Sequence, residues 1–387
     1  MADRRRDTLI SLAITIVMLT IANLALVYFS PVVFKRSVFP RAFINQVDPC
    51  YQTLYHDTHD GSLRDWVAVL GDSYGAGSGD EFLDGEADYG IFHKLRSQTH
   101  DNYLIFARGG FGSISAVREL SQCLNLFNGA WLLPDIENPS RVLFLFYEGN
   151  DLDNNLDHLQ ARAATGSLED FVAHEISTGE DDLQRRIRLL FPLYDVIWRQ
   201  VAYHSRGLWK GIRNSLKKFT AEGRDAGPRA GSAGTRTNSV ILAGRPHPVP
   251  ELPQSASAEL AGGLDRGLQL FYEAVMALQR LMPATPVTIV YLPSVVTTYS
   301  WQDPVQVQTY HTDGPVFTTT EDNDRQSRRI RQSIAEFTLT HGLGFVDTTP
   351  ALQAAARTEA VHGPRDWSHF NSRGYQMVSD AIAAAAP

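Results

Sequence analysis

A serine directly follows a short apolar run in the first quarter of the sequence. Residues 66–70 have the composition of a buried strand, and Gly71, Asp72 and Ser73 come next. Because ligands of open α/β sheets bind beyond the carboxyl ends of the strands, a serine at this turn can face a substrate instead of packing inside. Small polar turns are common, so the triplet indicates a catalytic serine only together with the further sequence motifs described below. The position predicts that Ser73 is a nucleophile.

A base and an acceptor for such a serine lie near the carboxyl end of the chain, at His369 and Asp366. A serine hydroxyl is a weak nucleophile at neutral pH, so it needs a base with a pKa near 7, and that base needs an acceptor to hold its tautomer. His369 and Asp366 can supply both. The alternatives are that Asp366 caps the last helix or that His369 packs in the core.

A metal site is a further alternative for this region, because His362, Asp366 and His369 lie close in sequence. Two histidines and a carboxylate can hold zinc or iron. That interpretation leaves the Gly-Asp-Ser turn unexplained, so the sequence predicts neither a metal nor a cofactor.

Two middle blocks offer hydrogen-bond donors at the ends of further apolar runs. The glycines of residues 107–113 can expose a backbone N–H, with Gly109 and Gly110 as candidates, and Asn150 carries a side-chain amide. Acyl transfer develops negative charge on the carbonyl oxygen, and each donor aimed at that oxygen contributes about 3 kcal/mol. We therefore expect Gly109 and Asn150 to be oxyanion donors.

Together the four blocks resemble the SGNH (GDSL-type) hydrolase family. That family is named for a serine, a glycine, an asparagine and a histidine, which correspond in order to Ser73, Gly109, Asn150 and His369. The last block matches the family pattern Asp-x-x-His-x-Asn-x-x-Gly-Tyr as far as Tyr375. The second block departs from the common Asn-x-Gly-x-x-Gly pattern, because Ala107 replaces the asparagine. The resemblance covers about residues 66–155 and 264–387.

The resemblance implies a three-layer α/β/α sandwich and an acyl-serine cycle without a cofactor. His369 would take the proton of Ser73, and Asp366 would orient His369. The N–H groups of Ser73 and Gly109, with the Asn150 amide, would form the oxyanion hole. Similar enzymes cleave acyl esters of lipids, sugars and small molecules.

The rest of the sequence must bring these blocks together. Short apolar runs alternate with amphipathic helices over residues 66–387, which is typical of a parallel sheet covered on both faces. The predicted strands are residues 66–70, 103–107, 142–147, 287–292 and 345–347. The sequence thus predicts an α/β fold with a five-stranded parallel, flavodoxin-like sheet.

A large insertion is predicted at about residues 152–263. Residues 184–219 are expected to be helical and carry nine Lys or Arg against one acid, Asp195, with aromatic residues between them. Such a helix can bind a headgroup surface or an acidic polysaccharide, or simply be a solvated helix packed on the domain. Residues 221–263 are rich in Gly, Ala, Ser and Pro, which predicts a flexible loop.

The first 36 residues are predicted to be a tail and a transmembrane anchor, followed by a linker at 37–65. Residues 9–29 form a stretch of 21 residues without a charge, which as a helix spans about 30 Å, the thickness of the bilayer core. The stretch is longer than that of a cleaved signal peptide and no small-x-small cleavage site follows it. Three basic residues precede the stretch and three follow it, Lys35, Arg36 and Arg41, so their number does not set the orientation. Arg4, Arg5 and Arg6 are consecutive and lie in a very short tail close to the membrane, which favours an amino terminus inside and the main domain outside the cytoplasm.

Charge and cysteine content limit the partners. The formal net charge of −8 argues against nucleic acid, whose binding usually shows as a basic surplus. Cys50 and Cys123 can pair in an oxidising compartment or remain two buried thiols.

These observations favour a membrane-anchored serine ester hydrolase that deacylates envelope carbohydrate or lipid. One alternative is an O-acyltransferase that modifies a surface polysaccharide. A single span cannot carry acyl groups across a bilayer, so this alternative requires a multi-span partner as acyl donor. A second alternative is a catalytically silent module that binds glycans.

Overall fold

The computed structural model describes Ser11, Ile14, Thr15, Ala25 and residues 17–22, 64–81, 89–129, 136–161, 166–177, 237–256, 263–308 and 316–385. The chain divides into two units, Met1–Tyr55 with Glu180–Arg236, and His56–Gly179 with Thr237–Pro387. The second unit contains the sheet and the candidate site. Within the described residues, no helix combines the length and the apolar character needed to span a membrane. About half of the predicted anchor at 9–29 lies outside the described residues, as does the predicted linker at 37–65 except for Arg64 and Asp65, and both stay predictions.

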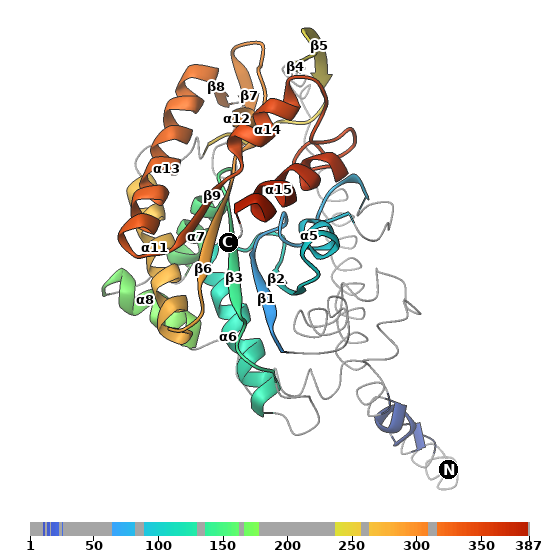
Figure 1. The fold of residues 1–387 in the computed structure, drawn as a ribbon, viewed down its shortest axis with the longest axis vertical. Coiled ribbons are helices and arrows are strands. Elements are labelled where there is room, and N and C mark those ends of the chain that lie inside the picture. Colours follow the sequence, from blue (N-terminus) through green and yellow to red (C-terminus); the bar gives the residue numbers. More distant parts are fainter. Residues whose placement is uncertain are drawn as a thin grey trace, which may run out of the picture. The chain divides into compact units, whose positions relative to one another are not determined.

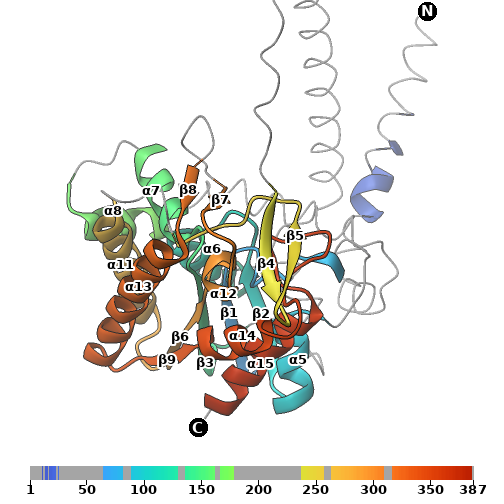
Figure 2. The same cartoon turned by 90° about the horizontal axis from the view of Figure 1, so that it is seen from above.

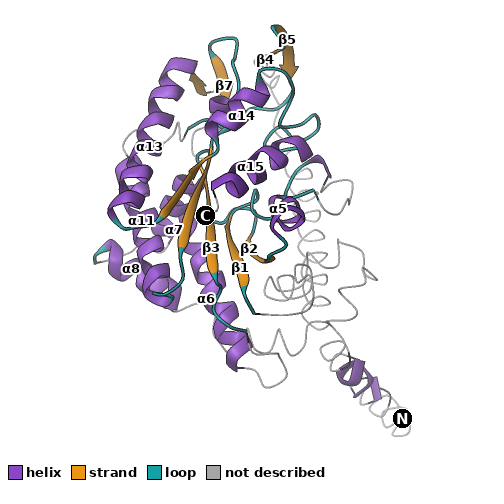
Figure 3. Ribbon diagram, in the orientation of Figure 1, coloured by secondary structure: helices purple, strands orange, loops and turns teal. Residues whose placement is uncertain are grey.

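Five parallel strands form the central sheet (Figures 1 and 3). They are β1 (Trp66–Gly71), β2 (Asn102–Ala107), β3 (Arg141–Tyr147), β6 (Val287–Leu292) and β9 (Gly344–Asp347). Their spatial order is β2-β1-β3-β6-β9, which is the flavodoxin-like order, with a ligand crevice expected at the carboxyl ends of β1 and β3. The five predicted strands are confirmed, each to within one residue at either end.

Burial explains why these runs become strands. All six residues of β1 are buried, and so are all residues of β3 except its first. A strand covered on both faces has no polar side to alternate with, so it appears in the sequence as a continuous apolar run. The register places the ends of the neighbouring strands together, with Gly71 opposite Ala107 and Leu70 opposite Phe144.

One face of the sheet is covered by α5 (Ile91–Thr99), α14 (Thr349–Ala356) and α15 (Ser372–Ala385). Figure 2 shows these three helices together along one side of the sheet. Their apolar side chains share a core with residues such as Val69 and Leu145 of the strands. The three-layer arrangement therefore has its first helical layer here.

The opposite face is covered by α6 (Ser113–Gly129), α11 (Leu264–Leu281) and α13 (Thr320–Thr340). The Phe271 ring of α11 packs 5.7 Å from that of Phe144 and 4.8 Å from that of Phe146. Buried residues of α11 recur every three or four positions, which turns one stripe of the helix toward the sheet. The second helical layer completes the predicted α/β/α sandwich.

The predicted insertion contains regular elements in its described parts. Helices α7 (Asp151–Ala161) and α8 (Leu168–Ser177) pack against α11, and α8 also contacts α6. These helices therefore extend the second helical layer. The predicted basic helix at 184–219 lies outside the described residues.

The prediction of a loop at 221–263 is wrong for its middle part, which forms a β-hairpin. Strands β4 (Asn238–Leu242) and β5 (Arg245–Val249) pair antiparallel around Ala243 and Gly244. Both turn residues have positive φ, 49° and 75°, as a two-residue hairpin turn of type I′ requires. The prolines at 246 and 248 argued against a strand, but β5 pairs only with β4 and is mostly exposed, and an edge strand tolerates proline.

Candidate active site

Ser73 lies in the turn after β1, at the carboxyl end of the sheet. The Asp72 carboxylate accepts the N–H of Tyr74 over 2.9 Å, which holds the turn in shape. Gly79, in the same loop, approaches the backbone of Phe370 so closely that a Cβ would overlap its carbonyl oxygen. The first block and the last block of the sequence are therefore in direct contact.

The three predicted catalytic side chains lie in one hydrogen-bonded row. The Nε2 atom of His369 is 2.9 Å from the Oγ of Ser73, and its Nδ1 atom is 2.7 Å from Oδ2 of Asp366. An ionised carboxylate only accepts, so Asp366 accepts a hydrogen bond from the Nδ1–H group, which keeps the proton on Nδ1 and leaves the lone pair of Nε2 toward the serine. This geometry makes His369 able to remove the Ser73 proton.

The Asp366 carboxyl is held in its charged form. Burial alone raises its pKa, but the hydrogen bond from His369, the charge of that ring and the N–H of Ser368 outweigh burial and bring the pKa below its ordinary value. Asp366 therefore stays ionised at neutral pH and can stabilise an imidazolium. Capping of the last helix, the alternative role for Asp366, is not what its carboxylate does here.

Two side chains that the sequence analysis missed hold the histidine loop in place. The Asp80 carboxylate accepts the N–H groups of Arg365, over 3.1 Å, and of Asp366, over 2.8 Å. The Tyr74 hydroxyl donates to the Ser368 carbonyl over 2.6 Å. Partners of Asp80 lie 285 and 286 residues away, so no local pattern could have identified it.

The two predicted oxyanion donors flank the serine in different ways. Gly109 follows β2, and the Cβ of Ser73, 3.9 Å away, is the nearest atom outside its own segment to the position that a Gly109 Cβ would take. Nothing lies within 4 Å of the corresponding position at Gly110, so by this measure Gly109 is the glycine that lies beside Ser73. Asn150 follows β3 and is nine-tenths buried at the start of α7. Both donors therefore reach the edge of the sheet at which Ser73 lies.

Two buried carboxyls lie behind the nucleophile. Burial raises the pKa of Asp72 to about 6, although the Tyr74 N–H, the His369 charge and a hydrogen bond from Asn150 oppose it. Burial, followed by repulsion from Asp72, raises the pKa of Asp151 well above its ordinary range. With a pKa near 6, Asp72 is ionised at neutral pH and adds negative potential beside His369.

His362, the third member of the alternative metal site, has another role. Its ring is fully buried, its Nδ1 atom is 3.2 Å from the Tyr299 hydroxyl, and burial lowers its pKa to about 3. Among the described residues, no group of three or more His, Cys, Asp or Glu could hold a metal ion. The neutral ring packs against Phe370 at 4.6 Å and so supports the loop that carries His369.

Glu148 was not predicted from the sequence to be part of the site. Its buried side chain supports the segment that carries Asn150. Its carboxylate is completely buried and accepts hydrogen bonds from four hydroxyls, those of Tyr291, Ser294, Thr297 and Ser327. Burial raises its pKa although all four hydrogen bonds oppose the change. Because Glu148 lies two residues before Asn150, this cluster positions the turn from which Asn150 projects.

Cys123 is buried in α6 and takes part in a disulfide bond. This agrees with the predicted pairing, because the sequence has only two cysteines. Cys50 itself lies outside the described residues.

Comparisons with known proteins give a likeness of fold at low identity. No protein-family model matches the sequence, and no curated protein matches it at a significant level. Among solved structures, an extracellular lipase of Streptomyces rimosus gives a TM-score of 0.39 at 14% identity, covering 83% of this chain and 99% of the lipase. Phospholipase A1 of Streptomyces albidoflavus gives 0.38 at 13% identity, covering 83% and 99%. LAE5, an alpha/beta hydrolase from the Lake Arreo metagenome, gives 0.32 at 12% identity, covering 83% and 94%.

Because these TM-scores lie below 0.5, the functional assignment rests on the geometry of the site. The strand order is that of the predicted flavodoxin-like sheet, and Ser73, Gly109 and His369 meet at one edge of it.

Proposed function

We propose that the protein is a serine ester hydrolase that works through an acyl-serine intermediate. One observation carries this proposal: the row of hydrogen bonds in which His369 lies 2.9 Å from the Ser73 hydroxyl and 2.7 Å from the Asp366 carboxylate. This row supplies a nucleophile, a base and a group that orients the base.

In the first half-reaction, Ser73 Oγ attacks the ester carbonyl carbon and His369 Nε2 takes the hydroxyl proton. Negative charge moves to the carbonyl oxygen, where the N–H groups of Ser73 and Gly109 and the Asn150 amide can stabilise it by donating hydrogen bonds. The tetrahedral adduct then breaks its bond to the alcohol oxygen, which takes the proton from His369. The alcohol leaves, and the acyl group stays on Ser73.

In the second half-reaction, water replaces the alcohol. His369 removes a proton from water as its oxygen attacks the acyl carbon, and the same proton returns to Ser73 Oγ when the acyl bond breaks. Asp366 remains ionised throughout and stabilises the imidazolium in both steps. The products are a carboxylic acid and the free enzyme.

The substrate class belongs to the same proposal: acyl esters of envelope carbohydrate or lipid, met outside the cytoplasm by a domain anchored through residues 9–29. The uncharged stretch of 21 residues and the arginines before it support the anchor and its orientation. Retention of the full chain in carbonate-washed membranes, with the domain open to added protease in spheroplasts, is the expected result. Release by carbonate would contradict the anchor without affecting the esterase.

Hydrolysis of p-nitrophenyl acetate by the full chain in detergent tests the enzyme assignment. Ser73→Ala is expected to abolish turnover and labelling by a fluorophosphonate, because no other oxygen replaces Oγ. Ser78→Ala in the same loop is the matched control and should keep both. Equal turnover by wild type and Ser73→Ala would refute the proposal, and inactivity of the wild type would favour a silent binding module.

A further inference from the structure

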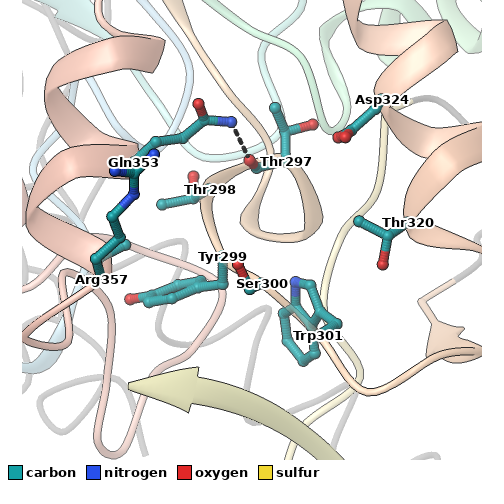
Figure 4. A pocket seen from close by; sticks show the side chains of 10 residues that line it. Thr297, Thr298, Tyr299, Ser300, Trp301, Thr320, Asp324, Gln353 and Arg357 are labelled. Carbon is teal, nitrogen blue, oxygen red and sulfur yellow. Dashed lines mark hydrogen bonds between the residues drawn. The ribbon is translucent and has the colours of Figure 1, made fainter. Parts of the chain in front are cut away.

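A cavity opens at the carboxyl-end edge of the sheet, beyond the strands β6 and β9. It has a volume of about 420 Å³ and lies between α13 and α14, over the short helix α12 (Val295–Thr298) (Figure 4). This volume falls in the range of small-molecule sites. Among its described lining residues neither Ser73 nor His369 occurs, so the cavity is separate from the catalytic row.

Hydroxyls and aromatic rings form most of the lining. Several of the polar groups are already used inside the protein: the Trp301 indole N–H donates to the Val296 carbonyl over 3.1 Å, and the Thr320 hydroxyl donates to Asp303 over 2.5 Å. These bonds keep the walls in place. They also leave few lining groups to meet a ligand.

Two charged side chains remain, one on each side of the cavity. Asp324 projects from α13 and Arg357 from the end of α14, and Figure 4 shows them on opposite walls. Within the described part of the chain, neither forms an ion pair. Asp324 offers only acceptors and Arg357 only donors.

This combination selects a ligand that is rich in hydroxyls. A hydroxyl can donate to Asp324 and accept from Arg357, whereas an acyl chain offers neither group a hydrogen bond. The Asp324 carboxylate repels an anion, and the charges of Arg328 and Arg331 already counter it, so an uncharged ligand suits the cavity better than an ion.

Tyr299, which lines the cavity, also supports the segment that leads to His369. The Tyr299 hydroxyl accepts the N–H groups of Val361, over 2.8 Å, and of His362, over 3.0 Å. Its ring lies 6.0 Å from that of Trp367, two residues before His369. Tyr299 therefore lines the cavity and also holds the segment that leads to His369.

We propose that this cavity is a subsite for an uncharged saccharide unit of the substrate. The inference rests on the proposed esterase function and narrows its substrate to acylated carbohydrate. A glycan bound here places a neighbouring acylated unit toward Ser73, around Tyr299. Asp324 and Arg357 are its specificity-determining residues.

Calorimetric titration of the full chain with xylotetraose, cellotetraose, mannotetraose and chitotetraose tests the subsite. At least one of these is expected to bind, and Asp324→Asn and Arg357→Gln should each weaken its binding by about tenfold or more, as loss of a charged hydrogen bond does. Glu336→Gln on α13 and Arg280→Gln on α11 are matched controls outside the cavity and should bind as wild type does. Absence of binding by all four sugars at about 10 mM, or unchanged binding by both cavity variants, would overturn the subsite.

Hydrolysis assays separate this inference from the esterase proposal. On the O-acetylated form of the sugar that binds, Asp324→Asn should raise KM about tenfold, whereas Glu336→Gln, outside the cavity, should keep the wild-type KM and the wild-type turnover of p-nitrophenyl acetate. Failure of the sugar experiments with an intact Ser73-dependent esterase removes only the subsite. A Ser73→Ala variant that still hydrolyses the ester removes the enzyme function, whatever the sugar data show.

Discussion

The Tyr74 hydroxyl donates a 2.6 Å hydrogen bond to the backbone carbonyl of Ser368, a residue 294 positions away. Tyr74 follows Ser73, the proposed nucleophile, and Ser368 precedes His369, the proposed base. The bond therefore joins the chain neighbours of the two groups between which the proposed mechanism transfers a proton. The Tyr74 ring is fully buried and lies 5.3 Å from the His369 ring, so packing and hydrogen bonding act on the same contact.

Tyr74→Phe is expected to lower kcat for p-nitrophenyl acetate about tenfold with little change in KM. The phenyl ring keeps the packing, and loss of one hydrogen bond of about 1 kcal/mol loosens the distance between serine and histidine. Tyr103→Phe, which loses a hydroxyl at the start of β2 far from the site, is the control for a general loss of stability. A kcat that falls equally in both variants would contradict a specific role for Tyr74.

Asn150→Ala is expected to lower kcat by about 10²-fold to 10³-fold, which corresponds to removal of one oxyanion donor. The change leaves Ser73 and His369 untouched, so labelling of Ser73 by a small alkylating ester should slow far less than turnover. Asn102→Ala at the opposite end of the sheet serves as the control. Turnover within threefold of wild type would exclude Asn150 from the oxyanion hole.

The strands were predictable because each is buried on both faces. Such a run must be apolar throughout, as in β1 and β3, and the glycines that end it mark the turn. Ser73, Asp366 and His369 were predictable because their chemistry limits the residue types that can serve. At these positions the local sequence pattern and the requirements of a serine nucleophile predict the same residues.

The supports of the site were not predictable, because they depend on partners far away in the chain. In the sequence, Asp80 and Glu148 look like ordinary polar turn residues. Only the fold shows that their carboxylates accept hydrogen bonds from distant segments. The β4–β5 hairpin was missed for a different reason: the prolines of its edge strand contradict strand propensity where tertiary packing permits them. The cavity between α13 and α14 combines three separate segments, and no one of them points to a cavity in the sequence.

Asp72 predicts a pH dependence of stability. Its pKa is about 6 in the folded protein and 3.8 as the ordinary value, so the unfolded chain releases this proton first. Stability from this group is therefore full below pH 4 and falls as the pH rises toward 6, by about 3 kcal/mol in total. Asp72→Asn lacks this loss, and its unfolding free energy relative to wild type should rise between pH 4 and 6.

Urea unfolding of wild type and Asp72→Asn at pH 4, 5, 6 and 7 measures this difference. Asn keeps the oxygen that accepts the Tyr74 N–H, so the turn itself is preserved. Asp265→Asn, at an exposed carboxylate on α11, is the control and should follow wild type at each pH. A constant difference between Asp72→Asn and wild type across this range would show that Asp72 does not titrate there.

Glu148→Gln is expected to lower both stability and turnover. The carboxylate accepts from four buried hydroxyls, and an amide offers one oxygen and places a donor against groups that now donate. A mismatch of this kind in a buried network costs about 1–3 kcal/mol. Because the network lies under the turn of Asn150, kcat should also fall, by about tenfold, and KM for a small ester should change little.

The control for this prediction is Glu359→Gln, which breaks an exposed ion pair with Arg373. An exposed pair contributes about 0–1 kcal/mol, so the control should unfold near the wild-type urea concentration. Combining Glu148→Gln with Asn150→Ala separates support from simple destabilisation. If Glu148 acts by positioning Asn150, its effect on kcat disappears once Asn150 is gone, whereas its effect on unfolding remains. Additive losses of kcat in the double variant would show that Glu148 acts on the site by another route.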